Sequence, residues 1–91
     1  MLGLIRSLAD RLGKDGIRIN AVSPGQILTP MLQPTVDLLP TGTFERRILL
    51  GRLGQAHEVA RAVRYLLSEE ASYITAAELV VDGGNISSQR M

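Results

Sequence analysis

Two short β-type segments flank a helical segment, and this order constrains the fold more than any other feature. Residues 17–22 (IRINAV) largely alternate and contain three β-branched side chains, so we predict a strand there. A second strand is predicted at residues 78–82 (ELVVD), which Gly83 and Gly84 close. A strand, a crossover that contains a helix and another strand should form a parallel, right-handed unit.

Two helices are predicted from apolar side chains that recur every three or four residues. The first stripe consists of Leu4, Ile5, Leu8 and Leu12, and the second of Val59, Ala60, Val63, Leu66 and Leu67. Gly13 and Gly16 should end the first helix. Glu58 should lie in the first turn of the second helix, where a negative charge suits the helix dipole. No capping residue precedes the first stripe, so we expect that helix to be the remainder of a longer one.

The stretch between the first strand and the second helix has no regular pattern. From Gln26 to Thr43 it is broken repeatedly, by Pro30, Pro34, Pro40 and Gly42. Loops longer than about 15 residues in a compact domain are usually functional or disordered. We expect at most a short helical turn near residues 35–39.

The predicted string is helix, strand, long loop, helix, strand within one partial domain, residues 1–91. Two strands are too few for an independent sheet, since about three or more are needed for stability. The pattern therefore predicts neighbours, either from a longer parent chain or from another subunit.

Composition excludes several classes of function. The 10 basic and 9 acidic residues give a net charge of +1, so neither a nucleic-acid nor a membrane partner is expected. The chain has no cysteine, and His57 is its single histidine, so no metal site is expected. It has neither an apolar run of about 20 residues nor a signal-peptide pattern at its start. A cytoplasmic location is the default expectation.

The end of the first predicted strand is the best candidate for a binding site, because open α/β sheets bind ligands beyond the carboxyl ends of their strands. There, Gly25 would let the backbone approach a flat ligand ring, and Thr29 would add a hydroxyl group. An ordinary strand-ending turn remains the alternative, and local chemistry alone favours it.

A resemblance changes that balance. Residues 16–25 (GIRINAVSPG), followed by Ile27 and Thr29, resemble the short-chain dehydrogenase/reductase pattern G-I-R-V-N-x-V-x-P-G, then x-I/V-x-T. Three more stretches match that family in order: SLA at 7–9, GRLG at 51–54 with EVA at 58–60, and YIT at 73–75 through VDGG at 81–84.

The resemblance implies the C-terminal part of a doubly wound, Rossmann-like parallel sheet of the α/β class. The parent protein would transfer a hydride between NAD or NADP and an alcohol or ketone, and would form homo-oligomers. Pro24 and Gly25 would shape the loop facing the nicotinamide. The backbone of Ile27 would meet the carboxamide, and Thr29 would lie near the carboxamide and the pyrophosphate. Residues 26–47 would form the mobile loop that covers a small-molecule substrate.

Other matched residues are expected to be structural. The resemblance makes Asn20 a strand-end residue, because the family's catalytic asparagine lies further upstream. Arg52, Glu58 and the Asp82-Gly83-Gly84 close are likewise expected to serve structure or an interface.

The departures from the family matter as much as the matches. No Gly-rich cofactor loop of the type T-G-x-x-x-G-x-G is present. The family's Y-x-x-x-K pair is also missing: Lys14 is the single lysine, while Glu69 and Ala77 stand four residues beyond Tyr65 and Tyr73. Met1 would fall a few residues past the position of that lysine. We therefore assign no catalytic residue and expect the chain alone to be inactive.

Two smaller departures concern the backbone. Ala56-His57 replaces the usual Pro-Glu, which removes a helix-starting proline. Ala76 stands where the family has glycine, and a glycine chosen for positive φ would make alanine costly there.

Two alternatives to a partial oxidoreductase stay open. The chain could be a non-catalytic interaction protein that pairs with full-length relatives through its intact last strand. It could also be a truncated product that does not fold, whose exposed apolar faces aggregate.

Overall fold

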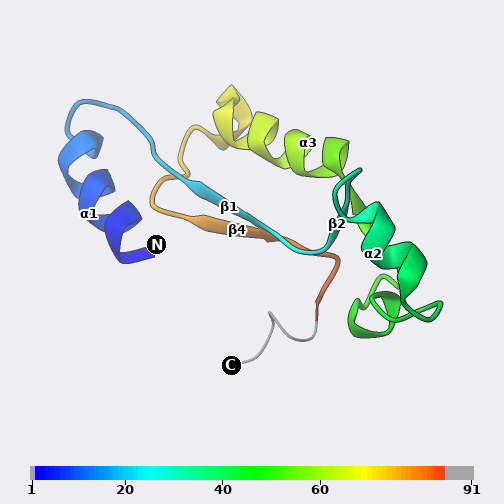
Figure 1. The fold of residues 1–91 in the computed structure, drawn as a ribbon. Helices are drawn as coiled ribbons and strands as arrows, with labels where there is room; N and C mark the ends of the chain where they lie inside the picture. The colour runs from blue at the N-terminus through cyan, green and yellow to red at the C-terminus, as the bar shows by residue number, and fades with distance from the viewer. Residues whose placement is uncertain (1, 86–91) are drawn as a thin grey trace.

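The computed structural model describes residues 2–85, which form three α-helices and four short strands with two 3-10 turns (Figure 1). In chain order, the elements are α1 (Leu2–Gly13), β1 (Ala21–Pro24), β2 (Ile27–Leu28), α2 (Gln33–Leu38), η1 (Glu45–Arg47), β3 (Gly54–Gln55), α3 (Ala56–Leu67), η2 (Glu69–Ala71) and β4 (Glu78–Val81).

Strands β1 and β4 pair in parallel, with Ala21 opposite Glu78 and Pro24 opposite Val81. Helix α3 lies in the crossover between them and runs along the strand pair (Figure 1). The predicted parallel strand–helix–strand unit is therefore confirmed, and Glu58 lies in the first turn of α3 as expected. The chain is of the α/β class.

The first strand begins later than predicted. We expected residues 17–22, but β1 spans Ala21–Pro24, because β4 offers a partner only from Glu78 onward. Before that point side chains hold the two segments together. The amide side chain of Asn20 donates to the Ile74 carbonyl at 3.1 Å and accepts from the Ala77 N–H at 3.0 Å. Asn20 thus has the structural role at the strand end that was expected of it.

Residues 26–47 were predicted to be a loop because prolines and Gly42 interrupt them, but they contain regular secondary structure. Ile27–Leu28 forms β2, which pairs in parallel with Gly54–Gln55 as β3. The short helix expected at residues 35–39 is α2, which begins earlier, at Gln33. The turn η1 completes the segment. Two-residue strands carry too few positions to show a period, so pattern reasoning missed them.

A turn before β4 forces Ala76 into the left-handed region, at φ 60°. Its N–H donates to the Ile19 carbonyl at 2.8 Å, which ties the turn to the approach of β1. The expectation that this position favours glycine is confirmed, since alanine carries a Cβ penalty there.

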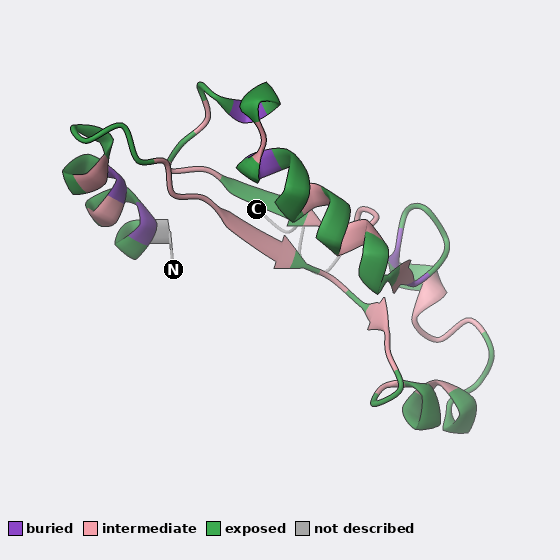
Figure 2. Ribbon diagram, turned by 90° about the horizontal axis from the view of Figure 1, so that it is seen from above, coloured by how far each residue is buried: buried purple, intermediate pink, exposed green. Residues whose placement is uncertain are grey.

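The core is small and discontinuous (Figure 2). Its buried apolar side chains are Ile5, Ala9, Ile48, Leu53, Leu66 and Ala71. Several residues predicted to lie on apolar helix faces are exposed, among them Leu4 at 61% and Leu67 at 78%. These side chains have no covering layer within the described part of the chain.

The overall dimensions agree with this incomplete burial. The accessible surface is 6887 Å², whereas a compact monomer of this mass would expose about 5,200 Å². The radius of gyration is 15.8 Å, against about 12 Å for a compact chain of this length. Helix α1 lies at one end of the long axis, and the segment that contains α2 lies at the other (Figures 1 and 2). Surface therefore remains available for further strands and helices.

Candidate cofactor-facing loop and lid

The candidate site begins where β1 and β4 end side by side. The Gly25 N–H donates to the Val81 carbonyl at 3.1 Å, which extends the ladder by one bond. A Cβ on residue 25 would overlap the Cβ of Asp82 and lie 2.9 Å from its Cα. Glycine is therefore required here by the packing of the two strand ends, independently of any ligand.

The other predicted site residues follow Gly25 directly. Pro24 is exposed at the last position of β1, and Ile27 is half-buried in β2. The Thr29 hydroxyl accepts from the Leu32 N–H at 3.2 Å. A hydroxyl group also has one proton to donate, and that proton has no acceptor among residues 2–85. Thr29 thus fits a ligand that presents an acceptor oxygen, such as a carboxamide or a phosphate.

The segment 26–47, which we call the lid, is fastened at its first end by β2. The Gln26 carbonyl accepts from the Gly54 N–H at 3.0 Å, and Ile27 lies opposite Gly54 in the β2–β3 pair. A Cβ on residue 54 would lie 2.8 Å from the Cδ1 of Ile27, so a larger residue would push this contact apart. The start of the lid is therefore held against the start of α3.

The second end of the lid is fastened to the chain that leaves β4. Leu49 and Leu50 donate their N–H groups to the carbonyls of Gly84 and Gly83, each at 3.0 Å. Both glycines have positive φ, at 63° for Gly83 and 77° for Gly84. The Gly-Gly pair after β4 is thus a structural clamp, as expected, and it brings the end of the lid beside the strand ends.

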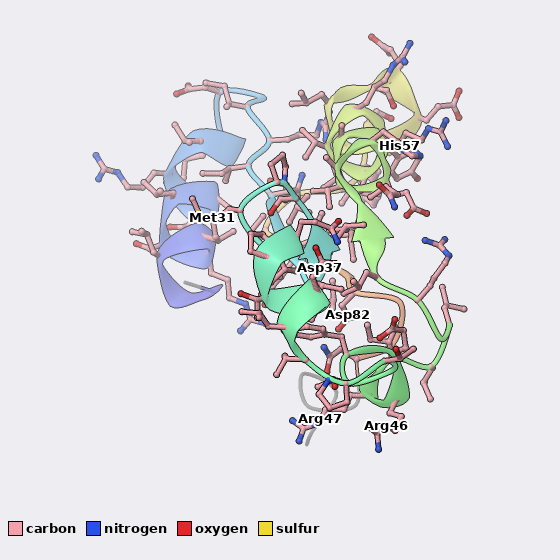
Figure 3. All side chains as sticks on the ribbon, turned by 45° about the vertical axis from the view of Figure 1, so that its right-hand side comes forward. Met31, Asp37, Arg46, Arg47, His57 and Asp82 are labelled. Carbon is pink, nitrogen blue, oxygen red and sulfur yellow. The ribbon has the colours of Figure 1, made fainter. Side chains whose placement is uncertain are left out.

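Between these two fastenings the lid carries exposed apolar side chains. Met31 is 91% exposed and Leu38 is 86% exposed. In Figure 3, Asp37 lies on α2, Met31 lies shortly before that helix, and His57 lies apart from both on α3. The lid therefore presents a partly apolar surface next to the carboxyl ends of β1 and β4.

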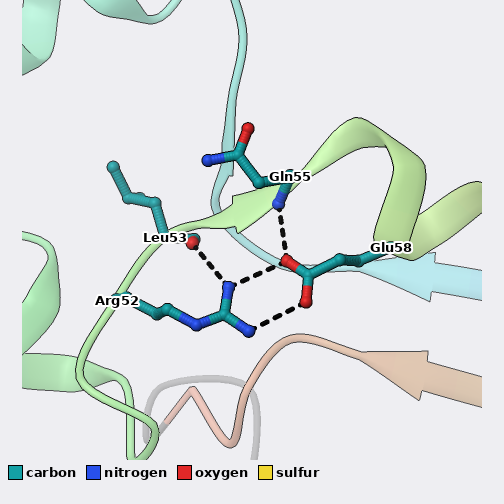
Figure 4. Close-up of polar contacts among 4 residues, drawn as sticks. All are labelled: Arg52, Leu53, Gln55 and Glu58. Atoms are coloured by element: carbon teal, nitrogen blue, oxygen red, sulfur yellow. Dashed lines mark hydrogen bonds and ion pairs between the residues drawn. The ribbon is translucent and has the colours of Figure 1, made fainter.

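Arg52 and Glu58 hold the start of α3 (Figure 4). The guanidinium donates two parallel hydrogen bonds to the carboxylate, Nη1 to Oε1 and Nη2 to Oε2, each at 2.8 Å. Glu58 Oε1 also accepts from the Gln55 N–H at 2.9 Å, which satisfies a free donor at the helix start. The hydrogen bonds from Arg52 and then from Gln55 lower the pKa of Glu58 to about 2. Both residues are structural, as expected.

Two cavities adjoin the loop. One of about 120 Å³ lies between the strand ends and Arg52, and it includes Gln26, Ile27 and Asp82. Another of about 420 Å³ lies between the lid and the chain after β4, lined by Gln26, Thr43, Phe44, Arg47 and Asn85. Sequence reasoning singled out neither Gln26 nor Arg47, because only the lid clamp brings residue 47 beside residue 85.

Residues 2–85 contain neither a cluster of metal-ligating side chains nor a membrane-spanning helix. In the part of the chain that the structure describes, no group of three or more His, Cys, Asp or Glu side chains could hold a metal ion. None of the helices within residues 2–85 is long and apolar enough to cross a membrane.

Comparison with known proteins decides the family. The family model described as Enoyl-(Acyl carrier protein) reductase matches residues 1–85. The chain belongs to the short-chain dehydrogenase/reductase family. Its relatives are oxidoreductases, and its parallel α/β fold matches their Rossmann-type structures.

Two short-chain dehydrogenase/reductase relatives illustrate the match. An uncharacterized short-chain type dehydrogenase/reductase of Sinorhizobium fredii is 45% identical over 89 residues, which cover 96% of this chain and 16% of that protein. The 3-alpha-(or 20-beta)-hydroxysteroid dehydrogenase of Mycobacterium tuberculosis is 45% identical over 85 residues, which cover 93% of this chain and 30% of the enzyme. The chain thus spans a third or less of the length of these relatives.

A solved structure extends the comparison to three dimensions. A 4-hydroxyisoleucine dehydrogenase mutant complexed with NADH and succinate superimposes with a TM-score of 0.84 at 29% identity. The match covers 94% of this chain and 36% of that enzyme. That enzyme therefore contains the same arrangement of strands and crossover helix as this chain.

Proposed function

We propose that the chain supplies the nicotinamide-facing loop and the substrate-covering lid of an NAD(P)-dependent short-chain dehydrogenase/reductase. The observation that carries the proposal is the position of residues 24–29. They leave β1 at the carboxyl edge of a parallel strand pair, and the lid is fastened beside them. A related enzyme was solved with NADH, which supports a nicotinamide cofactor.

In this proposal each residue has a defined task. The nicotinamide cofactor, when bound, supplies the hydride chemistry between an alcohol and a ketone. The backbone of Ile27 bonds the carboxamide, and the free hydroxyl proton of Thr29 is donated to a carboxamide or phosphate oxygen. Pro24 and Gly25 set the path of the loop, with Gly25 packed on Asp82. The lid covers the substrate and excludes water.

The chain alone has no assigned catalytic residue. Tyr73 is fully exposed, and neither Tyr65 nor Tyr73 has a lysine four residues later. A spectrophotometric assay of the pure 91-residue chain with NADH and with NADPH should show no oxidation with carbonyl substrates. Reading the coding DNA upstream of the Met1 codon is a second test. An in-frame Gly-rich loop and a Y-x-x-x-K pair there would supply the missing machinery.

A chimera tests the binding role directly. The segment of the Mycobacterium tuberculosis hydroxysteroid dehydrogenase that matches this chain is replaced by the corresponding residues of this chain. The chimera should bind NADH or NADPH, because the rest of the dinucleotide site comes from the relative.

A second candidate function is favoured by the exposed surface. The accessible area exceeds that of a compact monomer by roughly 1,700 Å², about twice the 800 Å² or so that each partner contributes to a standard protein–protein interface. On this hypothesis the chain is a non-catalytic partner that pairs with full-length relatives. Co-purification with such a relative would support the hypothesis. A chain that stays a monodisperse monomer and does not bind the relative would contradict it.

A further inference from the structure

The 420 Å³ cavity lies between the two ends of the lid and Asn85. It is not lined by residues 24, 25, 27 and 29, to which we assign the cofactor. Its walls come from three places: Gln26 at the start of the lid, Thr43, Phe44 and Arg47 at its end, and Asn85 after β4. Gln26 lies between Gly25 and Ile27, so the cavity opens directly beside the proposed nicotinamide-facing loop. A group bound there would lie beside Gln26, within the loop that we propose faces the nicotinamide.

The charge in this cavity is unbalanced. Arg47 lines it, and its side chain forms no hydrogen bond or ion pair with any residue in the range 2–85. The other side chains that line the cavity are neutral. The carboxylates of Asp37 and Glu45 line a neighbouring cavity, which shares Thr43 and Phe44 with this one.

Two other arginines near Arg47 have hydrogen-bond acceptors for their guanidinium groups. Arg52 is held by Glu58 through two bonds of 2.8 Å. Arg46, next in sequence to Arg47, donates from Nε to the Gly42 carbonyl at 3.2 Å and does not line this cavity. Arg47 is thus an exposed cation that lines this cavity and whose side chain has no hydrogen bond or ion pair among residues 2–85.

The surrounding groups suit one small anion. Gln26 adds an exposed amide side chain, whose N–H groups can donate to an anion, and Phe44 adds an apolar wall. The Thr43 hydroxyl donates to the Pro40 carbonyl at 2.5 Å, so it supplies no hydrogen bond to an anion. A single guanidinium matches the charge and the planar oxygen pair of one carboxylate.

We propose that Arg47 binds a carboxylate on the substrate, so that the parent enzyme acts on small alcohols or ketones that carry a carboxylic acid group. The inference rests on the proposed function for the identity of the ligand as a substrate. The binding of the carboxylate itself depends only on the cavity, and it can be measured without cofactor or catalysis.

The test is a titration of the isotope-labelled chain followed by amide NMR shifts. Succinate is the probe, succinamide is its neutral counterpart, and inorganic phosphate represents the other common anion. Succinate should shift the amides of Thr43 and Arg47 at millimolar concentration, at least about tenfold more tightly than succinamide. Succinamide binding as tightly as succinate, or phosphate binding more tightly, would overturn the proposal.

Two variants separate a built site from general surface charge. Arg47→Gln should weaken succinate binding about tenfold, whereas Arg46→Gln, with the same change of charge one residue away, should leave it within about twofold. Arg47→Lys keeps the charge and controls for folding, and it should retain part of the affinity. Equal losses in the two Gln variants, or a chain without helical circular dichroism, would contradict the assignment. Failure of this titration leaves NAD(P)H binding by the chimera unaffected, so the two proposals are distinguished.

Discussion

The missing side chain of Gly25 leaves the space that Asp82 fills. A Cβ on residue 25 would overlap the Asp82 Cβ and approach its Cα at 2.9 Å. The end of β1 and the end of β4 are thereby packed at closer range than any other residue would allow. The path of the proposed cofactor-facing loop is set by this contact.

Gly25→Ala should therefore destabilise the chain by about 1–3 kcal/mol, the usual range for overpacking against backbone. Urea unfolding followed by circular dichroism measures the change. Gly13→Ala is the matched control, since a Cβ at residue 13 meets nothing within 4 Å. A loss in the control as large as that in Gly25→Ala would show that contact with Asp82 is not the cause.

Ala76→Gly should raise stability by about 1 kcal/mol, because residue 76 has φ 60° and glycine carries no Cβ penalty there. Ala77→Gly, one residue later and outside that region, should lower stability by about 0.5–1 kcal/mol. The comparison uses the same urea unfolding. Destabilisation by both variants would contradict the account of this turn.

Stability should fall in acid through Glu58. Its folded pKa of about 2 lies below its ordinary value of 4.5, so its contribution is complete above about pH 4.5 and is lost as pH falls towards 2. Wild type should exceed Glu58→Gln in stability at pH 7, and the difference should shrink between pH 4.5 and 2. Glu70→Gln controls for the change in net charge. A difference between wild type and Glu58→Gln that is constant with pH would rule out this ion pair as the source.

The sequence was sufficient to predict the longer helices and strands, but not the tertiary contacts that connect them. Helix α3 and strand β4 have enough residues to show a period, so both were predicted close to their true positions. Strand β1 begins later than predicted because, before Ala21, the bonds to the segment preceding β4 come mainly from the Asn20 and Thr75 side chains, with one backbone bond from Ala76 to Ile19. The two-residue pair β2–β3 joins residues 27 and 54, a contact that no local pattern records.

The candidate site divides in the same way. Pro24, Gly25, Ile27 and Thr29 were proposed because they follow a strand end and match a family pattern. The cavity at Arg47 depends on Leu49 and Leu50 binding Gly84 and Gly83, which is a tertiary contact. Outside the candidate site, the family pattern also indicated the backbone conformation of residue 76. Alanine stands there in place of the family's glycine, and its φ is positive, at 60°.

Thr29→Val in the chimera should weaken NADH or NADPH binding about five- to tenfold, the effect of losing one hydrogen bond to a polar ligand atom. Quenching or enhancement of the cofactor's fluorescence gives the affinity. Thr41→Val makes the same chemical change on the lid, away from residues 24–29, and should leave cofactor affinity unchanged. A weaker affinity in Thr41→Val alone would contradict the assigned role of Thr29.

The most direct measurement is cofactor binding by the chimera itself. Our account predicts that the hydroxysteroid dehydrogenase carrying the corresponding residues of this chain folds and binds NADH or NADPH within about tenfold of the natural enzyme. A chimera with natural circular dichroism and unfolding behaviour that binds neither cofactor would contradict the central claim, because residues 24–29 would then not form a nicotinamide-facing loop.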